Sequence, residues 1–144
     1  MNMEDPQKFF ELLKKDHRFS LESYRFVNDA LTYAQNVMKL GKKEVSEPAG
    51  EVAPEEEDHV TGQDLCVAVC KFALEQYGYM AKLVLHNLGI RKTGDIGDIV
   101  YNMIDIGCLR RAENDRREDF DNVFDLAHDL ENGFQIDYKK SQNR

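Results

Sequence analysis

Two cysteines four residues apart, Cys66 and Cys70, form the first pair in this sequence whose spacing could hold a metal ion. On a helix, side chains at i and i+4 share one face, and two thiolates there can supply half of a tetrahedral zinc site. Further ligands would have to come from histidines such as His86, but no second close pair of Cys or His completes the set. Because both cysteines fall on the apolar side of the expected helix, we interpret them as small buried side chains and predict no metal.

Other polar patterns also fall short of a catalytic site. The stretch GDIGDIV, residues 94–100, lacks the lysine and the glycine spacing of a phosphate-binding loop. The carboxylates between residues 113 and 131 lack the glycine and the glutamate that a calcium loop requires. No Ser–His–Asp or Cys–His arrangement can be identified from spacing. We therefore predict a non-enzymatic protein without a cofactor.

The most informative stretch is KTGDIGDIVYNMIDIGCLRR, residues 92–111, which predicts a helix capped by Thr93 and followed by a strand. Five apolar residues at helical spacing predict its buried face: Ile96, Ile99, Val100, Met103 and Ile104. The same spacing places five polar residues on the opposite face: Asp95, Asp98, Tyr101, Asn102 and Asp105. We expect these five to form an outward, acidic surface that contacts a protein partner.

Two helices precede this one, and together the three have the outline of a winged helix-turn-helix domain, so DNA binding is the alternative function. The cations available for it are Arg91, Lys92, Arg110 and Arg111. A recognition helix lies close to the phosphates, and Lys or Arg normally supplies most of its affinity. Three aspartates and no base on the exposed face would be repelled. The charge pattern therefore weighs against nucleic acid.

Two helices are also predicted in the first forty residues. Pro6 suits the start of a helix that runs to about Lys15, and Ser20 can cap a second helix that ends at Gly41. Apolar residues cover much of the circumference of the second helix, which is typical of a helix enclosed in a core or in an oligomer interface. We interpret it as an internal core helix, with a homodimer through residues 20–40 as the alternative.

The predicted fold class is mainly α, in a single domain over residues 1–144. Residues 41–59 hold seven acids, two lysines, two prolines and two glycines, which predicts an acidic flexible loop. The expected parts, in chain order, are an N-terminal helix pair (1–40), that loop (41–59), a winged-helix-like core (60–125) and a C-terminal extension (126–144). Within the core we expect helices at about 61–78, 79–88 and 93–107, then a β-hairpin of strands 108–112 and 118–124.

The overall composition is that of one globular domain. The chain has 144 residues, 42% of them hydrophobic, and a formal net charge of −8. It contains no run of about 18 apolar residues, so no membrane span is expected. Its N-terminus has no apolar run of signal-peptide length, and three irregularly spaced cysteines suit a reducing compartment. We therefore expect a cytoplasmic protein.

Four stretches of the chain form a recognisable combination of helix motifs: DHRFSLESYRFVNDALTYA, FALEQYGYMAKLVLHNLGI, TGDIGDIVYNMIDIGCL and REDFDNVFD. Together they resemble a small uncharacterised bacterial protein family found mainly in planctomycetes and verrucomicrobia. The resemblance covers roughly residues 5–38 and 60–125. That family has no assigned activity, so the resemblance implies no functional residue. It implies a bacterial, cytoplasmic, stand-alone small protein whose helical segments belong to one unit.

Overall fold

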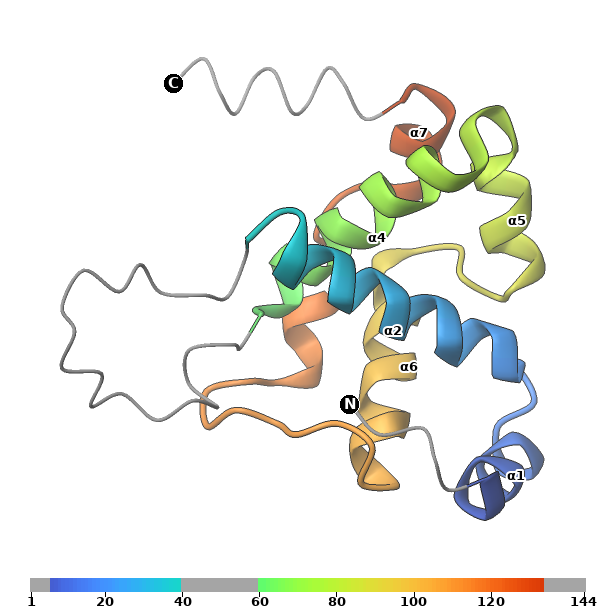
Figure 1. Ribbon diagram of the computed structural model, residues 1–144, viewed down its shortest axis with the longest axis vertical. Coiled ribbons are helices and arrows are strands. Elements are labelled where there is room, and N and C mark those ends of the chain that lie inside the picture. Colours follow the sequence, from blue (N-terminus) through green and yellow to red (C-terminus); the bar gives the residue numbers. More distant parts are fainter. Residues whose placement is uncertain (1–5, 40–59, 134–144) are drawn as a thin grey trace, which may run out of the picture.

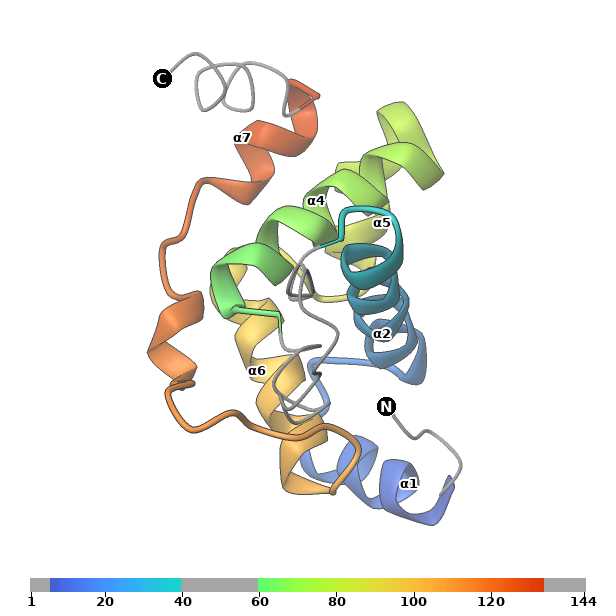
Figure 2. The same cartoon turned by 60° about the vertical axis from the view of Figure 1, so that its left-hand side comes forward.

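The computed structural model describes residues 6–39 and 60–133 of the protein. Its helices are α1 (Pro6–Lys15), α2 (Leu21–Asn36), α4 (Gly62–Tyr77), α5 (Ala81–Asn87), α6 (Thr93–Asp105) and α7 (Leu126–Glu131), with two short 3₁₀ helices, η1 (Gly78–Met80) and η2 (Arg117–Phe120). In Figures 1 and 2, α5 and α7 lie at one end of the molecule and α1 at the other, with α2, α4 and α6 between them. The prediction of a mainly helical fold is confirmed. The acidic loop at 41–59 and the last residues, from 134 on, lie outside the described part.

Helix α2 is a core helix, because its two apolar rows are largely enclosed. Tyr24, Val27 and Ala30 are fully or almost fully buried. On the side facing α4, the rings of Phe26 and Tyr33 both pack on Phe72 of α4, with ring centroids 5.3 Å apart in each pair. Most of the apolar surface of this helix is therefore buried within the chain. Whether residues 20–40 also form a homodimer contact stays a prediction.

The first helix, α1, docks on the rest through aromatic contacts. Phe9 and Leu12 are buried, and the Phe9 ring meets the ring of Tyr24 edge to face at 5.8 Å. Phe19, just before α2, also meets the ring of Tyr24 edge to face, with the ring centroids 6.1 Å apart. Edge-to-face aromatic pairs add to the free energy gained from burial alone. These contacts join α1 to α2 around one buried ring.

The corner between α1 and α2 is also tied to α6 by hydrogen bonds. The Asn102 side chain on α6 donates to Asp16 Oδ2 (3.0 Å) and to the Tyr24 hydroxyl (3.1 Å). Arg18 donates to the same Asp16 carboxylate (2.9 Å). The guanidinium of Arg18, and then the amide of Asn102, hold the pKa of Asp16 well below its usual range. Asp16 is thus an ionised acceptor that fixes the corner against α6.

The predicted β-hairpin is wrong, and with it the predicted winged-helix-like half of the fold, because the described residues contain no β-strand. Residues 108–112 are irregular, and 118–124 contain η2 and turns instead of a strand. Two aspartate side chains explain the difference: Asp115 accepts from the backbone N–H of Ala112 (3.1 Å), and Asp119 accepts from that of Arg116 (3.1 Å). Such side-chain caps stabilise tight turns and occupy the N–H groups that a β-ladder needs.

The most deeply buried aromatic residue of this irregular segment is Phe120. Its ring lies against Gly62 at the start of α4 and Gly97 in the middle of α6. A Cβ atom added at Gly97 would lie 2.6 Å from the Phe120 Cβ, a distance at which one of the two must move. A glycine inside a helix costs about 1 kcal/mol relative to alanine. The sequence predicts only a tolerated interior glycine, whereas the structure shows that Gly97 is needed for η2 to pack.

We predict that Gly97→Ala destabilises the protein by about 1–3 kcal/mol, as overpacking of a well-filled contact usually does. Urea unfolding followed by circular dichroism measures the change. In a Phe120→Gly background the obstructing side chain is gone, so the same substitution should be neutral or stabilising, because alanine is the better helix former. A Gly97→Ala protein at least as stable as wild type would contradict the close packing.

We predict that Asp16→Asn lowers the free energy of unfolding at pH 7 by about 1–2 kcal/mol, since the charged acceptor for Arg18 is lost. The folded-state pKa of Asp16 lies below its unfolded value, so its contribution is complete above about pH 4 and is lost as the pH falls through the folded pKa. Urea unfolding at pH 7, 4 and 3 should show the difference between the two proteins shrinking. Asp29→Asn, at an exposed position on α2, is the control for the change in net charge. A pH-independent difference would rule out the proposed ion pair as its source.

Candidate functional site

The acidic surface predicted on α6 is partly covered by the rest of the chain. Asp98 accepts hydrogen bonds from Arg18 Nη1 (2.9 Å) and from Arg117 Nε (2.6 Å). Arg117 also donates to the Gly94 carbonyl (2.9 Å) and to Asp121 (2.8 Å). The negative charge of Asp98 is therefore balanced by two arginines of the same chain, one in the α1–α2 corner and one in η2.

The other members of that predicted surface have separate positions. Asp95 accepts from two backbone N–H groups of the turn before α6 (2.9 and 3.2 Å), so Asp95 caps this helix. Thr93, the predicted cap, instead accepts from the backbone N–H of Val123 (3.2 Å). Tyr101 is half-buried, as are Asp95, Asp98 and Asn102, and only Asp105 is exposed. A partner contact at these five residues stays a prediction, but the structure brings most of them into internal contacts.

The four cations named for the nucleic-acid alternative are all exposed, but they form two separate pairs. Arg91 and Lys92 precede α6, whereas Arg110 and Arg111 follow it. A helix of 13 residues is about 20 Å long at 1.5 Å per residue, and it separates the two pairs. Arg111 Nη1 also donates to the Asp115 carbonyl (2.6 Å). The separation of the two pairs therefore adds no support for DNA binding.

The two cysteines of the possible metal pair are buried, with no exposed surface on either. Burial raises the pKa of the Cys66 thiol to about 12, so it remains protonated at neutral pH and is a poor ligand and nucleophile. Within residues 6–39 and 60–133, no group of three or more His, Cys, Asp or Glu side chains is placed to hold a metal ion. Nor is any helix in these ranges long and apolar enough to cross a bilayer.

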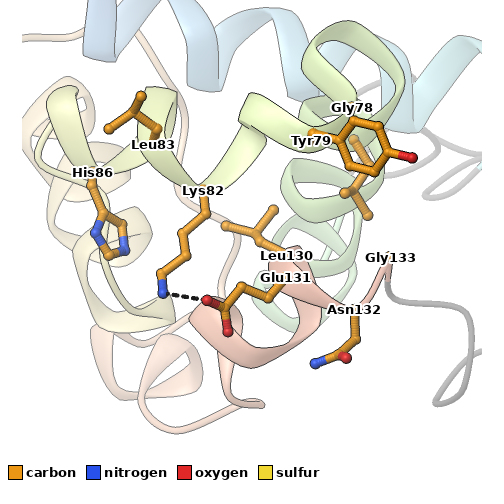
Figure 3. Close-up of a pocket in the computed structure, with 10 residues that line it drawn as sticks. Gly78, Tyr79, Lys82, Leu83, His86, Leu130, Glu131, Asn132 and Gly133 are labelled. Atoms are coloured by element: carbon orange, nitrogen blue, oxygen red, sulfur yellow. Dashed lines mark hydrogen bonds and ion pairs between the residues drawn. The ribbon is translucent and has the colours of Figure 1, made fainter.

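A groove lies between α5 and α7 and has a volume of about 720 Å³ (Figure 3). It exists because Gly78, at a φ of +53°, ends α4 and lets the chain turn through η1 into the short helix α5. On the opposite side, Asp125 caps α7 by accepting from the backbone N–H of His128 (3.1 Å). The two helices are linked by Lys82 and Glu131, whose charged atoms are 2.9 Å apart.

Large apolar side chains are exposed beside this groove. The exposed fractions are 106% for Tyr79, 52% for Met80 and 53% for Leu83. Tyr79 and Leu83 line the groove, and Met80 lies between them in sequence. Scattered exposed apolar residues are normal, but three within five residues of the chain, two of them lining a groove, are characteristic of an interaction site. We call Tyr79, Met80 and Leu83 the apolar rim.

The polar groups of the groove carry little net charge. Desolvation, and then the nearby charges of Lys82 and Arg91, lower the pKa of His86, so its ring is neutral at pH 7. Its Nε2 atom is buried and has no hydrogen-bond partner in the described part of the chain. Lys82 lowers the pKa of Glu131, which keeps that ion pair formed. The groove therefore offers an apolar surface, one internal ion pair and one neutral imidazole.

Sequence reasoning missed this groove, although a signal for it was present. In the stretch QYGYMAKL, Tyr79, Met80 and Leu83 are large and apolar, yet they lie off the buried stripe that the sequence predicts for the helix at 79–88, which is Ala81, Val84, Leu85 and Leu88. Large apolar residues on the polar side of an amphipathic helix indicate a contact beyond the local core. Patterns of polar residues alone do not reveal such a contact.

No family model, no characterised protein and no solved structure matches the chain. The role of the groove therefore has to be derived from its own geometry.

Proposed function

We propose that this chain is a non-enzymatic, bacterial cytoplasmic interaction module and that the groove between α5 and α7 is its binding surface. The observation that carries the proposal is the exposure of the apolar rim beside a groove large enough to accept side chains. Leaving these residues in water is unfavourable: covering the fully exposed Tyr79 with a partner contributes about 1.5–3 kcal/mol, and covering the half-exposed Met80 and Leu83 about half as much each. A partner that covers all three gains enough for reversible binding, even after the entropic cost of association.

The composition of the groove favours binding over catalysis. Its lining includes no Ser, Thr or Cys among the described residues, so a conventional hydroxyl or thiol nucleophile is not at hand. His86 has no carboxylate hydrogen-bonded to its ring in the described part, which is how a catalytic imidazole is usually oriented. The carboxylate that does line the groove, Glu131, is paired with Lys82.

The groove is also better suited to a partner than the acidic face of α6. A partner at α6 would have to compete with Arg18 and Arg117 for the Asp98 carboxylate. A partner in the groove displaces only water from the apolar rim, because those three side chains project outward. The free energy of desolvation therefore favours the groove.

We predict that peptides selected from a phage-displayed library against the wild-type protein depend on Leu83. Leu83→Asp should weaken their binding at least about tenfold, since one apolar anchor is replaced by a charge. Fluorescence polarisation with labelled peptides measures the dissociation constants, and circular dichroism checks that the variant is folded.

Val37→Asp is the matched control for this measurement. Val37 follows α2 and is 62% exposed, similar to Leu83, but it lies outside the groove. Its substitution should leave peptide binding unchanged. Failure to select any peptide, or selected peptides that bind the Leu83→Asp and Val37→Asp proteins equally well, would contradict the proposed binding surface.

A further inference from the structure

The groove and a side chain able to fill it lie on the same surface of the molecule. Tyr79 stands at the edge of the groove and its ring is fully exposed (Figure 3). In a two-fold symmetric dimer the same patch serves both subunits, so that patch must be complementary to itself. A projecting ring beside a groove meets this condition, because the ring of each copy can enter the groove of the other.

The charged residues of the groove also make this patch complementary to itself. The chain as a whole has a formal net charge of −8, so two copies repel each other unless their contact is locally neutral. The charged residues that line the groove are Lys82 and Glu131, one of each sign, and they form a pair at 2.9 Å. Two copies facing each other here bring no unbalanced charge together, and each presents both an acid and a base to the other.

The remaining exposed large apolar residues of the described part are less suited to this role. Phe10 on α1 is 56% exposed, but its ring is already covered on one side by the Lys14 ammonium at 4.9 Å. Val37 is a single aliphatic residue at the end of α2, and Tyr77 is stacked on the ring of Phe26. Tyr79 and Leu83 instead line a groove of about 720 Å³, larger than the groove of about 390 Å³ that Phe10 lines.

We infer that the partner filling the groove is a second copy of this chain, related by a two-fold axis, with Tyr79 of each copy in the groove of the other. This inference rests on the proposed function, because it assigns an occupant to the same groove. It differs from the predicted dimer through residues 20–40, whose apolar rows are largely enclosed by α4 and by aromatic contacts within the chain.

Sedimentation velocity of the full-length protein between about 5 and 500 µM tests the inference. The wild type should show a concentration-dependent monomer–dimer equilibrium. Tyr79→Ser and Leu83→Asp should each raise the dimer dissociation constant by tenfold or more, because a two-fold interface loses every side chain twice. Both residues are exposed, so the variants should keep the wild-type circular dichroism spectrum. Val37→Asp should leave the equilibrium unchanged.

Three results would overturn the inference. The first is a wild type that stays monomeric over the whole range. The second is a dimer weakened by Val37→Asp and not by Leu83→Asp, which would place the contact on α2. The third is association seen only when residues 134–144 are removed, which would indicate an occupant from the same chain. Groove-binding peptides selected for a monomeric wild type would leave the proposed function standing, so the two failures can be told apart.

Discussion

The carboxylate of Asp98 is the point at which three parts of the chain are joined. It lies on α6 and accepts hydrogen bonds from Arg18 at the α1–α2 corner and from Arg117 in η2. Neither arginine sits in a long element, because the corner has no helix and η2 has four residues. Without both cations, α6 would present a partly desolvated charge without a partner. We therefore interpret this network as specifying how the corner, α6 and η2 are arranged, rather than as a large source of stability.

Much of the helical framework could be predicted from local patterns, whereas the residues that cover the polar face of α6 could not. The apolar spacing from Ile96 to Ile104 places α6 correctly, and the helix predicted at about 61–78 is observed as α4. The sequence predicts that the polar face of α6 faces solvent. In the structure Arg18 covers part of it, and Arg18 is eighty residues away from Asp98 in sequence. No spacing rule connects residues so far apart. Periodicity identifies the side of a helix that is apolar, but it cannot identify the cations that cover the other side.

The hairpin and the groove were missed for different physical reasons. The sequence predicts a strand over 118–124, but Asp115 and Asp119 stabilise turns that compete with a ladder. The groove depends on how α5 and α7 meet, which is a tertiary property, and its signal in the sequence is only the unexpected apolar character of Tyr79 and its neighbours. Exposure of this kind becomes meaningful once the core has been assigned.

The packing of Phe120 against two glycines limits which side chains can replace these residues in related sequences. Position 97 leaves room for no more than a hydrogen atom, and a Cβ atom at position 62 would lie only 3.1 Å from the Phe120 ring, while position 120 supplies a whole aromatic ring. The volume available at these three sites is shared, since α4, α6 and η2 all border it. In related sequences, side-chain size at 97 and at 120 should therefore change in opposite directions. Such a covariation would link a helix interior to an irregular segment that has no regular backbone pairing of its own.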